Sequence, residues 1–114
     1  MSTLGLRAVI DALADALTLS TNELARALGA SPVTVKRWRA GTHLPQGEGR
    51  TRLDRLLELG ERLDRSFGTA EAARVWLDSR NRYLGGFTPR DALLLGRLDR
   101  VHAALEALDS GIFV

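Results

Sequence analysis

Four side chains that can bind nucleic acid lie close together within residues 31–37: Ser31, Thr34, Lys36 and Arg37. An arginine can donate two hydrogen bonds to guanine O6 and N7, and a threonine can contact a thymine methyl group or a phosphate. Three more arginines nearby have the charge to bind phosphates, which position a protein on DNA without reading its sequence: Arg39, Arg50 and Arg52. The pattern predicts a DNA-binding surface, and the alternative is a helical hairpin whose arginines are only solvated.

Side chains that could support catalysis or bind a metal are few. The sequence has no Cys, and its two histidines, His43 and His102, have no second ligand at a spacing that zinc sites use. Carboxylates one helical turn apart, such as Asp11 and Asp15, have arginine neighbours and suit solvated helix surfaces better than acid–base chemistry. No nucleophile stands beside a base, and no glycine-rich segment has the spacing of a phosphate-binding loop. We therefore expect no enzyme activity, no metal and no cofactor.

Two short helices are needed to position residues 31–37. Ser20 followed by Glu23 forms a capping box, which predicts the start of the first helix, and a glycine at position 29 is suited to end it. Ser31 then caps the second helix, with Pro32 at its first position. Two short helices joined by a tight turn are typical of a helix-turn-helix motif, in which the second helix enters the major groove of DNA.

The remainder of the chain also has helical periodicity, and no segment alternates in the way a strand does. Capping residues and apolar spacing predict about six or seven short helices, at residues 6–17, 20–29, 31–41, 51–67, 69–80, from 88 onward, and over 98–111. Thr51 with Asp54 is expected to open the fourth helix after a Gly- and Pro-containing loop at residues 41–50. Trp38 and Trp76 are expected to anchor the core. The predicted fold class is all-α.

Length and charge suggest two parts with different tasks. A chain of 114 residues has room for one domain, or for two small ones that share a core. Residues 20–55 carry seven basic and three acidic side chains, whereas residues 61–114 are balanced. We expect a helix-turn-helix domain over residues 1–59 and a second helical domain over residues 60–114. No apolar run is long enough for a membrane span or a signal peptide, so we expect a cytoplasmic protein without membrane contact.

Two segments resemble a known family. The stretch with Ser31, Thr34, Val35, Arg37, Trp38, Gly41 and Pro45 is similar to Xre-class helix-turn-helix domains. The second half resembles the toxin-binding domain of the Xre/MbcA/ParS antitoxins, through Trp76, Leu77, Asn81, Tyr83–Gly86, Thr88–Leu93 and Gly111–Val114. Together the two segments cover nearly the whole chain in the order of the family. The chain departs from the family pattern at Val33, commonly polar, and at Arg39, where an acidic residue is common.

The resemblance implies a small antitoxin that pairs with a RES-domain toxin attacking NAD⁺. In the family, the C-terminal domain blocks the entrance of the toxin's active site, and the helix-turn-helix is assigned to autorepression of the operon. Expected partners are therefore the RES-domain toxin, operator DNA and a second copy of the chain, with a higher-order hetero-oligomer formed with the toxin. The candidate toxin-binding residues are Arg80, Arg82, Tyr83, Arg90, Gly111, Ile112, Phe113 and Val114.

The apolar tail is a reasonable binding element on physical grounds as well. Burial of Phe113 in a partner's pocket would contribute about 2 to 3 kcal/mol, and a carboxylate beside it could pair with a cation in a site that binds phosphates. The alternative is that the tail folds back on the core of its own chain. A different function also remains open, that of a stand-alone DNA-binding repressor that uses its second half only to dimerise.

Overall fold

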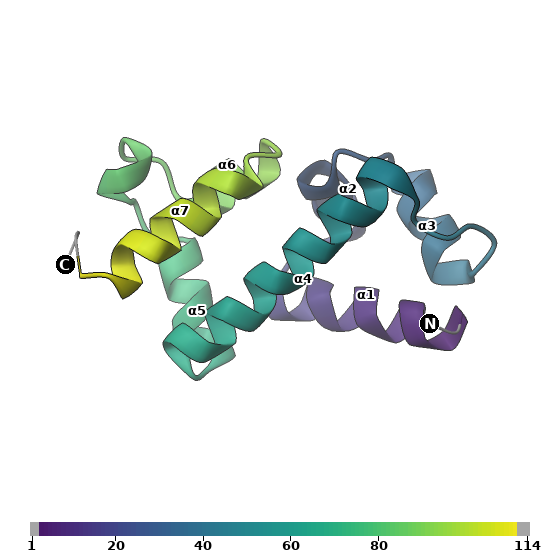
Figure 1. Cartoon of the computed structure of the whole chain (residues 1–114), viewed down its shortest axis with the longest axis horizontal. Helices are drawn as coiled ribbons and strands as arrows, with labels where there is room; N and C mark the ends of the chain where they lie inside the picture. The colour runs from purple at the N-terminus through teal and green to yellow at the C-terminus, as the bar shows by residue number, and fades with distance from the viewer. Residues whose placement is uncertain (1–2, 112–114) are drawn as a thin grey trace.

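The computed structural model describes residues 3–111, and within this range every regular element is a helix, which confirms the all-α prediction. Seven α-helices and one short 3-10 helix follow one another along the chain (Figure 1): α1 (Thr3–Leu17), α2 (Thr21–Leu28), α3 (Pro32–Ala40), α4 (Gly47–Phe67), α5 (Ala70–Leu77), η1 (Arg82–Leu84), α6 (Pro89–Leu94) and α7 (Leu98–Asp109). In the described part of the chain, no helix is both long and apolar enough to cross a membrane.

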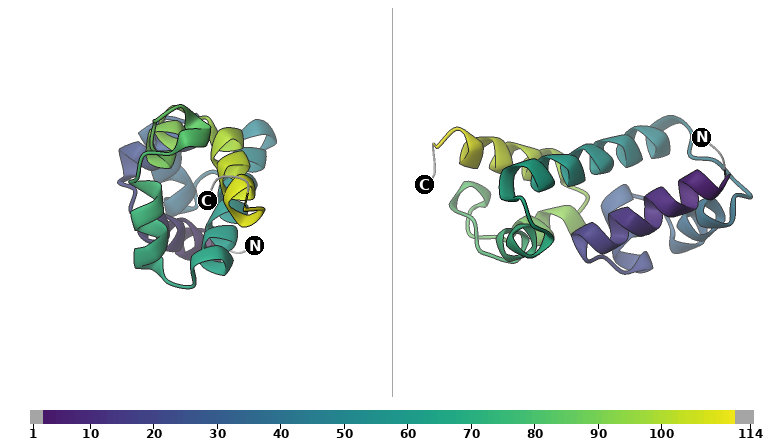
Figure 2. Two further views of the ribbon diagram at one scale, coloured as in Figure 1. Left: turned by 90° about the vertical axis from the view of Figure 1, so that its left-hand side faces the viewer. Right: turned by 90° about the horizontal axis from the view of Figure 1, so that it is seen from below.

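Helix α4 connects the two ends of an elongated molecule that measures 44 × 25 × 22 Å. Helices α1, α2 and α3 surround its first half, and helices α5, α6 and α7 lie toward its second half (Figure 1). Figure 2 shows α4 and α7 along one long side of the molecule, with α1 and α5 along the opposite side. We call α1–α3 the front half and α5–α7 the rear half. The predicted domain boundary between residues 59 and 60 falls inside α4, and the division into two domains stays a prediction.

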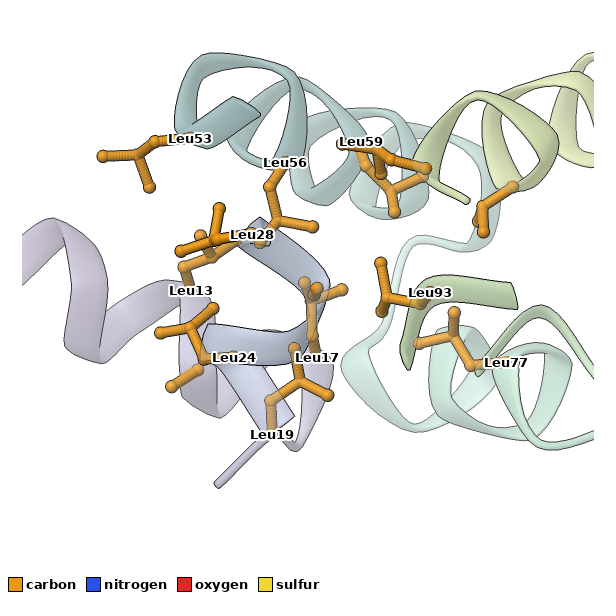
Figure 3. Close-up of a cluster of buried hydrophobic side chains, with 14 of the residues drawn as sticks. Leu13, Leu17, Leu19, Leu24, Leu28, Leu53, Leu56, Leu59, Leu77 and Leu93 are labelled. Carbon is orange, nitrogen blue, oxygen red and sulfur yellow. The ribbon is translucent and has the colours of Figure 1, made fainter. Parts of the chain in front are cut away.

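A single hydrophobic core extends through both halves. Leucines of α1, α2 and α4 meet Leu77 of α5 and Leu93 of α6 in one buried cluster (Figure 3). Leu17, Leu59 and Leu77 are fully buried, and burial of a leucine contributes about 1.5 to 3 kcal/mol. The two halves are therefore held together by packing and not by α4 alone.

The helix-turn-helix forms as its capping residues predict. Ser20 Oγ accepts a hydrogen bond from the backbone N–H of Glu23 (3.1 Å), and the Glu23 carboxylate accepts one from the backbone N–H of Ser20 (2.9 Å). Gly29 ends α2 with a φ of 65°, a conformation that glycine adopts without steric cost. Ser31 caps α3 by accepting from the backbone N–H of Thr34 (3.1 Å). The later Thr88–Asp91 capping box, which starts α6, is also present.

Helix α1 begins at Thr3, three residues before the predicted start at residue 6, and two further helix boundaries differ from the prediction. Helix α4 begins at Gly47, four residues before the predicted start at Thr51, and the Thr51 hydroxyl bonds to the Gly47 carbonyl inside the helix (3.2 Å). The Trp38 ring packs against Gly49, where an added Cβ would lie 3.3 Å from it, so a tertiary contact supports this first turn. Helix α5 ends at Leu77 and not at Arg80, since Asp78 is its C-cap and Asn81 caps η1.

Candidate functional sites

Helix α3 presents a polar surface to solvent. Val35 and Trp38 are buried under the helix, as predicted for Trp38, while Lys36 and Arg37 are exposed and form no salt bridge with any residue from 3 to 111. The hydroxyls of Ser31 and Thr34 lie 2.9 Å apart at the start of the helix. A hollow of about 410 Å³ beside α3 is lined by Thr34, Arg37, Trp38, Thr42, His43, Leu44 and Gln46. The predicted DNA-binding residues Ser31, Thr34, Lys36 and Arg37 thus lie on α3 or at its N-cap. Val33 lies beside them and is 53% exposed.

Arg39 is committed to contacts within the chain. Its Nε lies 2.9 Å from Asp11 Oδ1, and its Nη1 donates to Thr21 Oγ1 (2.7 Å). Only 26% of the Arg39 side chain is exposed. Arg39 therefore ties α3 to α1 and α2. Its contact with Asp11 compensates the positive charge of its guanidinium at the C-terminal end of α3.

The other two predicted phosphate-binding arginines lie on the first turns of α4. Arg50 pairs with Asp54 (3.0 Å), and Arg52 lies 3.6 Å from Glu48. Arg52 also donates to the Leu28 carbonyl at the end of α2 (3.4 Å). Exposed ion pairs of this kind contribute about 0 to 1 kcal/mol, so a phosphate could replace the carboxylate at little cost.

A pocket of about 250 Å³ opens where α5, η1 and α7 meet, and we call it the Trp76 pocket. It brings together three predicted toxin-binding residues, and its lining consists of Trp76, Ser79, Arg80, Asn81, Arg82, Tyr83, Ala104 and Leu108. The Asn81 side chain accepts a hydrogen bond from the backbone N–H of Tyr83 (2.9 Å), which fixes η1 at the rim of the pocket. Trp76 is half-buried and packs on Phe67, with ring centroids 5.7 Å apart.

The chemistry of the Trp76 pocket suits a ligand with an apolar group and an anionic group. Trp76 and Leu108 offer apolar surface, whereas Arg80 and Arg82 are exposed and form no salt bridge within the described range 3–111. An unpaired guanidinium can bind a carboxylate or a phosphate through two parallel hydrogen bonds.

Arg90 does not line this pocket and instead bonds to other residues of the same chain. Its guanidinium pairs with Asp78 and donates to the Leu17 carbonyl (2.9 Å) and to Thr18 Oγ1 (2.7 Å). The side chain is only 16% exposed. Because the last carbonyls of a helix lack partners in the helix itself, Arg90 satisfies the end of α1 and joins it to α5 and α6.

The last predicted toxin-binding residues lie at the end of the chain. Gly111 is exposed after α7 and has a φ of 73°. Ile112, Phe113 and Val114 lie outside the described residues. Their role stays a prediction.

A second rear pocket, also of about 250 Å³, was not foreseen, and we call it the Phe87 pocket. It is lined by Leu84, Phe87, Ala92, Leu95, Arg97 and Arg100. Phe87 is 62% exposed and Leu95 is 66% exposed. The run Leu93-Leu94-Leu95 could have predicted an exposed apolar side chain here, because three successive residues on a helix point in different directions and cannot all face one core.

Comparisons with known proteins agree with this architecture. Residues 62–111 match the family described as the antitoxin Xre/MbcA/ParS C-terminal toxin-binding domain. The chain is 32% identical over 109 residues to the mycobacterial cidal antitoxin MbcA of Mycobacterium tuberculosis, covering 96% of each chain. The same identity and coverage hold for MbcA of Mycobacterium bovis. The fold matches a chain from the crystal structure of the M. tuberculosis MbcT–MbcA toxin–antitoxin complex with a TM-score of 0.66, over 96% of this chain and 97% of that one.

Proposed function

The chain belongs to the Xre/MbcA/ParS family of antitoxins, and we propose that it neutralises a partner toxin by binding it through residues 60–114. The partner in this proposal is a RES-domain toxin that consumes NAD⁺, as the family resemblance implies. The antitoxin acts by covering the entrance of the toxin's active site and makes or breaks no covalent bond itself. Both proteins would act in the cytoplasm.

One observation carries the proposal: the rear half exposes apolar side chains beside unpaired arginines. Phe87 and Leu95 are more than half exposed, and Arg97 and Arg100, which line the same pocket, lack a carboxylate partner among residues 3–111. Interfaces between proteins are enriched in aromatic residues and arginine. The segment matched by the toxin-binding family, residues 62–111, contains all four of these side chains.

The shared core would help the rear half to bind. Leu77 and Leu93 are fully buried against the front half, and Arg90 ties α6 to the end of α1. A surface held in place before binding loses less conformational entropy when the complex forms, which leaves more of the interaction energy as affinity. We propose that the tail, residues 112–114, adds a contact at the entrance of the toxin's site.

NAD⁺ consumption by the purified cognate toxin tests this proposal. An equimolar amount of the full chain should abolish consumption, while a chain ending at Ser110 should keep its helical circular dichroism but inhibit about 30- to 150-fold less strongly, if burial of Phe113 contributes about 2 to 3 kcal/mol. Undiminished NAD⁺ consumption with the full chain contradicts the antitoxin proposal. Equal inhibition by both chains removes only the tail from the mechanism.

We propose a second role for α3, namely binding of operator DNA by a homodimer and repression of its own operon. Lys36 and Arg37 are exposed on the second helix of a helix-turn-helix, and this placement supports the role. A higher-order hetero-oligomer with the toxin would then join both activities. If the chain binds DNA but leaves toxin activity unchanged, the alternative of a stand-alone dimeric repressor is favoured.

A further inference from the structure

The two rear pockets lie along the same face of α7. Arg100 lines the Phe87 pocket, whereas Ala104 and Leu108 line the Trp76 pocket. Residues four positions apart in an α-helix lie above one another on one face, so these three side chains lie along one side of α7, where Ala104 itself is buried. Helix α6 and η1 both pack against α7 (Figure 1). The 3-10 helix η1 contributes Tyr83 to the Trp76 pocket and Leu84 to the Phe87 pocket, and α6 contributes Ala92 to the Phe87 pocket. We call the combined surface the α7 groove.

The opposite face of α7 is already occupied by α4. His102 Nε2 lies 3.1 Å from the Arg55 carbonyl oxygen, and Arg62 pairs with Glu106 (2.8 Å). Glu106 is two positions from both Ala104 and Leu108, which places it about 200° away around the helix. The α7 groove is therefore turned away from α4, and a partner can cover it without displacing the packing of α7 on α4.

The groove combines apolar surface with cationic ends. Phe87 and Leu95 are exposed at one end, and Trp76 and Leu108 line the other. Four arginines border the two ends, and none of them forms a salt bridge or a side-chain hydrogen bond with residues 3–111: Arg80, Arg82, Arg97 and Arg100. From Arg100 to Leu108 the helix rises about 12 Å, enough for two turns of a bound segment.

We propose that the α7 groove is the docking surface for the toxin, and that its occupant is a toxin segment with apolar side chains between carboxylates. This inference rests on the proposed function and specifies the surface that performs it. Charge complementarity selects the occupant, because apolar groups would cover Phe87 and Leu95 while carboxylates meet the arginines at both ends. A second copy of this chain fits less well, since a symmetric dimer built on this groove would bring the arginines of both copies together.

Binding of the purified cognate RES-domain toxin to full-length variants tests the inference. The variants Phe87→Ser and Leu95→Ser should each weaken binding at least tenfold, because the bound segment would bury both exposed side chains, and a few buried apolar contacts carry much of the affinity of an interface. The matched control is Val75→Ser on α5, which replaces a side chain that is 59% exposed and lines neither rear pocket. This control should change affinity less than twofold.

Charge reversal provides a second readout that does not depend on apolar surface. The double variant Arg97→Glu/Arg100→Glu should slow association with the toxin and weaken its dependence on salt concentration, while circular dichroism melting checks that each variant is folded.

Unchanged toxin binding by folded Phe87→Ser, Leu95→Ser and the charge-reversed chain overturns the inference but leaves the antitoxin role intact. If the unmodified chain fails to bind the toxin, the proposed function and the inference both fall. Conversion of a dimer to a monomer by Leu95→Ser would identify a second copy as the occupant and also overturn the inference.

Discussion

The front and rear halves of the molecule use their arginines differently. In the front half and the first turns of α4, Arg7, Arg39, Arg50 and Arg52 each lie near a carboxylate of the same chain, whereas Arg26 and Arg37 pair with none among residues 3–111. In the rear half, the four arginines that border the α7 groove have no such partner among the described residues. Among the described residues, four of the six exposed large apolar side chains lie in the rear half, and three of these line the α7 groove: Tyr83, Phe87 and Leu95.

This contrast supports the proposal that the rear half binds the protein partner. The charge of an arginine with a carboxylate neighbour is partly neutralised. Unpaired arginines beside exposed apolar side chains, in contrast, are a combination that protein–protein interfaces often contain. On the front half, Lys36 and Arg37 on α3 have no carboxylate partner within residues 3–111, and the hollow beside Arg37 includes hydrogen-bonding side chains of Thr34, Thr42 and Gln46. Such a surface suits the phosphates and base edges of DNA more than an apolar protein partner.

The largest expected effect comes from breaking the core that both halves share. Leu59→Ala should lower the free energy of unfolding by about 2 to 5 kcal/mol, because Leu59 is fully buried in the middle of α4. In single-tryptophan variants, Trp38 reports on the front half and Trp76 on the rear half, and both should show the same thermal transition. Leu44→Ala, at an exposed position, should change stability by less than about 0.5 kcal/mol. Two separate transitions would mean that the halves fold independently.

A smaller loss of stability is expected when Arg90 is replaced, and almost none when Arg82 is replaced. Arg90→Met should cost about 2 to 3 kcal/mol of stability, since it removes the charged hydrogen bonds to the Leu17 carbonyl and Thr18 and leaves Asp78 without its partner. Arg82→Met should leave the melting temperature nearly unchanged and weaken toxin binding instead. Chemical denaturation and a toxin-binding titration distinguish the two. Equal stability of both variants would show that Arg90 does not join the halves.

The smallest expected effect concerns DNA binding by the front half. Arg37→Ala should reduce the preference for operator over random DNA by about 1 to 2 kcal/mol, because a bidentate contact to a base is lost. Arg50→Ala should weaken binding to all sequences about equally and reduce the salt dependence, as expected for a phosphate contact. Fluorescence anisotropy with both DNAs at several salt concentrations measures this difference. An Arg37→Ala chain with unchanged preference would exclude α3 as the element that reads the bases.

Signals confined to a few neighbouring residues predicted the structure well. Ser20 with Glu23 and Ser31 followed by Pro32 each start a helix, as expected from their spacing alone, and Thr88 caps the helix that was expected from residue 88 onward. The same reasoning placed the start of α4 at Thr51, which was wrong, because packing of Trp38 against Gly49 supports an earlier turn. Local capping rules contain no information about a ring that arrives from another helix.

The sequence by itself determined the helical fold class, most helix starts and the membership of a family, since these depend on residue spacing along one chain. Only the tertiary structure decided which arginines are free. Arg39 and Arg90 look like their neighbours in sequence, yet their partners Asp11 and Leu17 lie far away along the chain and reach them only after folding. The α7 groove depends on the same kind of proximity, because α7 meets η1 and α6 only when the core has formed.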